Sequence, residues 1–127
     1  MREIKFRVWD SQQKRMYRVS QIHWDELGMK FWKWTGIEMA KSLGDALMQY
    51  TGRKDKNGKE IYEGDIVNFI REYSTKPEQG SIQYVWAEFG IRFMEQDGEI
   101  LQYPISSCKY IEAIGNIYEN PELQVPQ

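Results

Sequence analysis

Apolar and polar side chains alternate along much of this 127-residue chain, and Gly-containing turns interrupt the alternation at short intervals. Residues 3–9 set the pattern, because Ile4, Phe6 and Val8 alternate with three charged side chains. A period of two places the apolar residues on one face of a half-buried strand. The chain is therefore expected to fold mainly as short β-strands.

The first 46 residues are expected to form an N-terminal β-hairpin region. A polar loop at residues 10–14 separates the first strand from a second apolar segment at residues 16–22, which predicts a hairpin. Residues 30–34 also suit a strand that carries both of its tryptophans on one face. Residues 37–43 are expected to be irregular or to form a short helix.

The remaining residues, 47–127, are predicted to form an SH3-like small β-barrel with a C-terminal tail, packed with the first region as a single unit. Five or six short strands joined by tight turns can close on themselves and remove exposed edges. The Asn57-Gly58 pair predicts a type I′ turn. The segment at 66–73 has apolar residues on both faces and so needs cover on both sides. The predicted fold class is mainly β, with at most one short helix.

Charge is distributed unevenly along the chain. The net charge of −2 argues against a nucleic-acid partner for the chain as a whole. Residues 1–20 nevertheless hold six basic and two acidic side chains, whereas residues 95–127 hold one basic and six acidic ones. This difference is typical of two solvated faces of opposite sign. Alternatively, the two ends meet across a subunit interface or bind a charged partner.

The chain carries the features expected of a cytoplasmic protein. Its lone cysteine, Cys108, cannot form an intrachain disulfide, which favours a reducing compartment. Charged residues recur directly after Met1, so no signal peptide is expected. The apolar runs are far shorter than the roughly 18 residues of a membrane span.

Three patterns that suggest catalytic or metal chemistry fail on inspection. The glycine-rich segment 52–59 has five residues between its glycines where a phosphate loop has four, and Glu60 replaces the required Ser or Thr. A thiolate–imidazole pair of His23 and Cys108 needs contact that the sequence does not indicate. One His and one Cys cannot complete a Cys/His zinc site. No catalytic residue, cofactor or metal ligand is expected.

Four segments of the chain resemble the YopX-like family of phage and prophage proteins. They are Met1–Asp10 (MREIKFRVWD), Leu47–Gly52 (LMQYTG), Lys54–Val67 (KDKNGKEIYEGDIV) and Ile114–Leu123 (IGNIYENPEL). The resemblance covers nearly the whole chain and is loosest from residue 20 to 46. It implies a small phage-encoded protein with an SH3-like barrel in its C-terminal part and no known activity, so no catalytic residue carries over.

The residues that carry the resemblance are explained first as folding signals. Gly58 permits a turn, and Gly64 with Asp65 suits a sharp entry into the next strand. Gly115 is expected to allow a bulge or a close backbone approach. Arg53 departs from the family pattern, which usually has an apolar residue there, often Leu, so inward packing of this position is in doubt.

The leading hypothesis is a non-enzymatic phage or prophage interaction module that associates with itself or binds a host or phage protein. Its candidate interface residues are Ile66, Ile70, Trp32 and Trp34. The alternative is a nucleic-acid-binding accessory protein. Its candidate contacts are Lys5, Arg7, Lys14, Arg15, Arg18 and Lys33. An enzyme of unrecognised type is the third hypothesis, and no small-molecule substrate is inferred.

Overall fold

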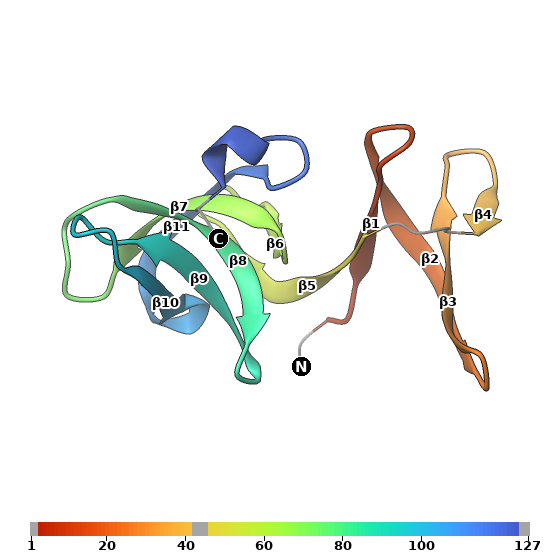
Figure 1. The fold of residues 1–127 in the computed structure, drawn as a ribbon, viewed down its shortest axis with the longest axis horizontal. Helices are drawn as coiled ribbons and strands as arrows, with labels where there is room; N and C mark the ends of the chain where they lie inside the picture. Colours follow the sequence, from red (N-terminus) through yellow and green to blue (C-terminus); the bar gives the residue numbers. More distant parts are fainter. Residues whose placement is uncertain (1–2, 42–45, 125–127) are drawn as a thin grey trace. The chain divides into compact units, whose positions relative to one another are not determined.

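The computed structural model describes residues 3–41 and 46–124, which form a mainly β protein (Figure 1). This confirms the predicted fold class. The helical elements of the described residues are two three-residue 3₁₀ helices, η1 (Ile105–Ser107) and η2 (Pro121–Leu123). None of the helices in this part of the chain is long and apolar enough to span a membrane. The chain divides into two compact units, Met1–Tyr50 and Thr51–Gln127, called here the first and second units.

The first unit is an antiparallel sheet with strand order β4-β3-β2-β1-β5. Its strands are β1 (Phe6–Asp10), β2 (Arg15–Asp25), β3 (Gly28–Trp34), β4 (Met39–Lys41) and the first part of β5 (Ala46–Lys54). The predicted N-terminal hairpin is present, because β1 pairs with β2 up to Asp10 and Arg15. The Asp10 carboxylate holds the turn by accepting backbone hydrogen bonds from Gln12 and Gln13.

The prediction of a short helix at 37–43 is wrong where the structure describes it. Met39 and Ala40 lie in β4 and pair with Trp34 and Lys33 of β3, and Lys41 continues the pairing. Seven residues hold too few helical turns to compete with an available strand edge. Residues 42 and 43 lie outside the described residues.

The second unit contains a five-stranded antiparallel sheet with strand order β10-β9-β8-β7-β11. Its strands are β7 (Asp65–Arg71), β8 (Glu78–Val85), β9 (Glu88–Met94), β10 (Ile100–Pro104) and β11 (Cys108–Asn116), preceded by β6 (Glu60–Tyr62) beside β5. The helix η1 connects β10 to β11, the two edges of the sheet. The sheet is open in this description, so the closed SH3-like barrel is not confirmed.

A continuous hydrophobic core lies within the second unit. Phe69 and Phe93 meet edge to face with ring centroids 5.2 Å apart, and Tyr103 stacks on Phe69 from the other side of the cluster. The β7 residues Ile66 and Val67 are both fully buried although they point to opposite faces, as the two-faced apolar pattern predicted. The buried members of the core are Ile61, Val67, Phe69, Ile82, Phe89, Ile91, Phe93, Ile105, Cys108 and Ile111.

The hairpin turns of the second unit differ from the predicted types. At Asn57-Gly58 the N–H of Gly58 donates to the Asp55 carbonyl. The φ of Gly58 is 82°, whereas the φ of Asn57 is not positive. This is a type I turn followed by a left-handed glycine, not type I′. The two-residue loop between β8 and β9 has positive φ at both Trp86 and Ala87, the geometry that type I′ requires.

Candidate functional site

The sheet of the first unit places Trp9, Trp32, Trp34 and several of its cations on the same face. The register pairs Arg7 with Arg18 and Arg18 with Trp34, so these three side chains form a row across β1, β2 and β3. Alternation along each strand brings further residues to this face. We call it the tryptophan face, and its members are Lys5, Arg7, Trp9, Met16, Arg18, Gln21, His23, Lys30, Trp32, Trp34, Met39, Lys41 and Met48.

Several side chains of the tryptophan face are exposed around Trp34, from β2 to the edge strand β4. Trp34 is 43% exposed, Arg18 and Lys41 are exposed, and Trp32 is half-buried. The acids near this face lie at its margins, where Asp25 contacts Lys30 at 3.2 Å and Glu3 contacts Lys5 at 3.2 Å. This part of the face, across β2, β3 and β4, therefore combines positive charge with an accessible indole ring.

The opposite face of the same sheet carries a buried ion pair. The Lys33 ammonium lies 2.6 Å from Asp10 and 5.1 Å from the centre of the Tyr17 ring, and Lys33 is only 7% exposed. The hydrogen bond from Lys33 is the main cause that holds the pKa of Asp10 below its usual value, and the Gln12 and Gln13 N–H groups act in the same direction. Lys33, a candidate nucleic-acid contact of the sequence, is therefore buried and paired inside the unit.

Beyond this ion pair, the opposite face becomes an exposed apolar strip. Ile22 pairs with Phe31 and Trp24 pairs with Met29 at the end of the β2–β3 hairpin. Trp24 is 68% exposed, and Leu27 in the turn is 87% exposed. We call Ile22, Trp24, Leu27, Met29 and Phe31 the apolar strip. Alternation in the sequence did not point to these residues. The turn at residues 25–28 between two apolar segments does, however, indicate the β2–β3 hairpin that carries them.

The remaining candidate contacts do not gather in one place. Lys5, Arg7 and Arg18 share the tryptophan face with Trp32 and Trp34. Lys14 lies in the β1–β2 turn with a φ of 55°, and Arg15 points to the opposite face of the sheet. Register thus divides the predicted basic set between the two faces.

The two candidate interface residues of β7 have different environments. Ile66 is fully buried within the chain. Ile70 is half-buried and lines an open groove of about 580 Å³ together with Asn68, Pro77, Glu78, Gln79 and Tyr110. The strand pattern did not reveal which of its two apolar faces the rest of the chain covers.

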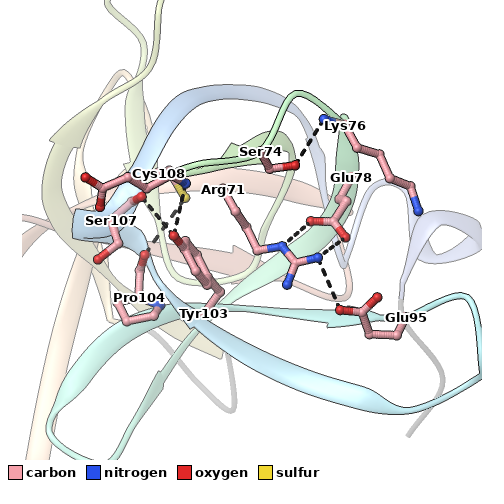
Figure 2. Close-up of polar contacts among 10 residues, drawn as sticks. Arg71, Ser74, Lys76, Glu78, Glu95, Tyr103, Pro104, Ser107 and Cys108 are labelled. Atoms are coloured by element: carbon pink, nitrogen blue, oxygen red, sulfur yellow. Dashed lines mark hydrogen bonds and ion pairs between the residues drawn. The ribbon is translucent and has the colours of Figure 1, made fainter.

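The charged groups beside this groove are engaged in structural contacts (Figure 2). The Arg71 guanidinium donates to both carboxylate oxygens of Glu78, at 2.8 and 3.0 Å, and contacts Glu95 at 3.2 Å. It also lies 5.1 Å from the centre of the Phe93 ring. A bidentate, stacked arginine of this kind ties β7, β8 and the end of β9 together. The groove thus contains no carboxylate poised for acid–base chemistry among the residues that line it.

The sulfur of Cys108 is unsuited to nucleophilic chemistry. Burial raises the pKa of the Cys108 thiol to about 11, so the thiol is protonated at neutral pH. Its Sγ lies 3.9 Å from the Pro104 carbonyl, beside the Tyr103 hydroxyl that donates to Ser107 (Figure 2). His23 lies exposed on the tryptophan face of the first unit. In the part of the chain that the structure describes, no three His, Cys, Asp or Glu side chains could hold a metal ion.

The residues of the Lys54–Val67 segment act as folding devices. The buried Asp55 carboxylate accepts hydrogen bonds from the N–H groups of Asn57, Lys59 and Ala113 at 2.8–3.0 Å. Two hydrogen bonds fasten the β5–β6 turn to β11. One runs from Ala113 N–H to Asp55, and the other from Lys56 N–H to the Ile111 carbonyl. Asp65 accepts from Tyr62 N–H at 2.8 Å and holds the next turn in the same way.

Two further positions of the sequence analysis also have structural roles. Gly115 lies at an irregularity in the β11–β7 register, and a Cβ there would lie 2.3 Å from the Asn120 side-chain oxygen. The predicted close approach at this glycine is therefore confirmed. Arg53 is half-buried and donates hydrogen bonds to the carbonyls of Ile105 and Cys108, so a polar contact replaces the apolar packing of its position.

Comparisons with known proteins match this fold over almost its full length. A family model described as YopX protein matches residues 5–124. The crystal structure of protein EF1440 from Enterococcus faecalis is similar with 28% identity and a TM-score of 0.61, covering 98% of this chain and all of that one. The protein yopX from Bacillus subtilis has 21% identity and a TM-score of 0.62, covering 95% of this chain and 98% of that one. No curated protein matches the chain.

Proposed function

This chain belongs to the YopX family, and we propose that it is a non-enzymatic interaction module whose apolar strip binds another protein. The module is proposed to be phage- or prophage-encoded and to act in the cytoplasm of a bacterial host. The partner that the charges favour is a second copy of the same chain. The single observation that carries this proposal is the exposure of large apolar side chains at the end of the β2–β3 hairpin.

The composition of the apolar strip suits a protein interface. Trp24 and Met29 are cross-strand neighbours that are 68% and 42% exposed, and the half-buried pair Ile22 and Phe31 extends the surface along the strands. Contiguous exposed apolar surface is typical of binding sites. Tryptophan and methionine are enriched at interfaces, and buried tryptophans contribute most to binding energy.

Charge favours a second copy as the partner. The first unit holds nine basic and six acidic residues, whereas the second unit holds eight basic and thirteen acidic ones. The units thus carry net charges of +3 and −5. The first unit of one copy and the second unit of another are therefore electrostatically complementary, which speeds association and orients it.

The chemistry of the second unit supports a role without catalysis. The Cys108 thiol is protonated and buried, while the Asp55 and Glu78 carboxylates accept the structural hydrogen bonds described above. These groups stabilise turns and strands. A host or phage protein remains the alternative partner for the apolar strip.

Light scattering coupled to size exclusion tests the proposal. We expect a dimer or larger assembly at micromolar concentrations, and we expect Trp24→Asp to shift it toward the monomer because the aspartate introduces a charge into the apolar contact. Ile37→Asp is the matched control, since Ile37 is 89% exposed in the first unit but lies between β3 and β4, outside the apolar strip. A monomeric wild-type protein at all concentrations contradicts self-association. Equal effects of the two variants contradict the assignment to the apolar strip.

A further inference from the structure

We propose that the tryptophan face, on the side of the sheet opposite the apolar strip, binds single-stranded nucleic acid. Trp32 and Trp34 stack with two bases, and Arg7, Arg18 and Lys41 contact the phosphates. This site goes beyond the proposed function, because it uses a different surface and a different class of partner.

The spacing of the two indoles fits successive bases of an extended strand. Trp32 and Trp34 lie two residues apart on β3, which places them about 6.5 Å apart on the same face. Trp34 is 43% exposed, so its ring is accessible to a ligand. Aromatic side chains on an open sheet bind unpaired bases by stacking and do so with little sequence preference.

Cations surround these rings on both sides. Arg18 is directly opposite Trp34 on β2, and Lys41 is directly opposite Trp32 on β4. Arg7 is opposite Arg18 and extends the row of cations to β1. The charge that matters here is the +3 of the first unit, not the −2 of the whole chain.

The composition of this face favours a nucleic acid over a protein. Protein interfaces are depleted in lysine, yet Lys5, Lys30 and Lys41 all point to this face. Glu3 and Asp25 lie at its margins and contact Lys5 and Lys30. Basic residues interleaved with accessible aromatics are the combination that single strands require.

Fluorescence anisotropy of a labelled oligothymidine of about 16 nucleotides tests the proposal directly. We expect binding that weakens strongly between about 50 and about 200 mM salt. Trp34→Ala is expected to weaken binding at least about 5-fold through lost stacking. Arg18→Ala is expected to lower the slope of log affinity against log salt by about 0.7 through one lost phosphate contact. Trp86→Ala, at an 86% exposed tryptophan of the second unit, is the control and should bind as wild type.

The outcomes separate this site from simpler explanations. No anisotropy change at low salt overturns the proposal. Loss of binding in Arg18→Ala with wild-type binding in Trp34→Ala shows a charged patch without stacking and also overturns it, as does equal affinity for duplex DNA. An oligouridine titrated in parallel shows whether the site distinguishes RNA from DNA. Because Trp24→Asp reports the apolar strip, failure of one proposal leaves the other testable.

Discussion

The second unit uses its apolar residues to build a core, whereas the first unit leaves many of its own at the surface. Ten residues of the second unit form a buried cluster around Phe69 and Phe93. The first unit is described as one sheet, and its exposed large apolar residues include Trp24, Leu27 and Trp34. A sheet with apolar residues on both faces is normally covered by another layer. Both proposed binding surfaces therefore use apolar side chains that the first unit leaves exposed.

The family resemblance covers segments of both units and is loosest within the first. The segments 54–67 and 114–123, which resemble the YopX-like family closely, lie in the second unit, where Asp55 and Gly115 hold turns and close backbone contacts. The segment 20–46, where the resemblance is loosest, supplies most of the apolar strip and both central tryptophans of the tryptophan face. Recognising the family therefore identified the residues that fold the chain better than those proposed to bind its partners.

The largest expected effect tests whether the two units differ in packing. Phe69→Ala removes a fully buried ring from the core of the second unit and is expected to cost about 3–5 kcal/mol of unfolding free energy. Phe31→Ala removes a half-buried ring from the first unit and should cost only about 1–2 kcal/mol. Urea unfolding followed by circular dichroism measures both. Tryptophan fluorescence adds a probe of the first unit, which contains four of the five tryptophans.

Equal costs for the two substitutions contradict the comparison. They show that the first unit has a core as tightly packed as that of the second. Its exposed side chains then need no binding partner to explain them.

The next effect concerns the acid that fastens the β5–β6 turn to β11. Burial acts to raise the pKa of Asp55, but hydrogen bonds from Ala113, Lys59 and Asn57 outweigh it and leave the pKa below its usual value. The stability that Asp55 contributes is therefore present above the unfolded pKa of about 4 and is lost as pH falls through the lower folded pKa. Asp55→Asn should cost about 2 kcal/mol at neutral pH.

Denaturation of Asp55→Asn and wild type across a pH series checks this account. The difference between them should shrink as pH falls below about 4. Asp97→Asn is the matched control, since Asp97 accepts one backbone hydrogen bond, from Glu99, in the β9–β10 turn. Binding of the oligothymidine should be unchanged in Asp55→Asn above pH 6. A constant difference at every pH shows that the carboxylate charge is not what stabilises the turn.

Alternation alone predicted the strands well but assigned faces poorly. In β2 the register shifts between Val19 and Gln21. Ile22 therefore shares a face with Val19 and Tyr17, although it lies an odd number of residues from each of them and strict alternation would place it on the other face. This bulge depends on pairing with β3 and breaks the period of two that sequence reading uses. By contrast, alternation places Lys33 correctly on the face opposite the tryptophan face, because Lys33 lies between Trp32 and Trp34.

Turn geometry was predicted less well than turn position. Asn57-Gly58 and Asp97-Gly98 both mark turns, and each has its glycine in the left-handed region with a hydrogen bond from the glycine N–H. The type I′ geometry occurs at Trp86-Ala87, where neither residue favours it. The pairing of Val85 with Glu88 leaves only two residues for the reversal, so the strands impose this backbone conformation.

The smallest expected effect uses that strained turn to test whether binding is confined to the first unit. Ala87 has a φ of 64°, a conformation that costs an L residue about 1–2 kcal/mol. Ala87→Gly removes this strain but adds freedom to the unfolded chain, so a net gain of about 0.5 kcal/mol is expected in urea unfolding. Gly98→Ala is the reverse control, because a Cβ there meets nothing within 4 Å and only its φ of 90° opposes the change.

If Ala87→Gly stabilises the fold while oligomer size and oligothymidine affinity stay constant, the strain follows from the short loop alone. If either property changes, the exposed Trp86 takes part in binding and the second unit is more than a scaffold.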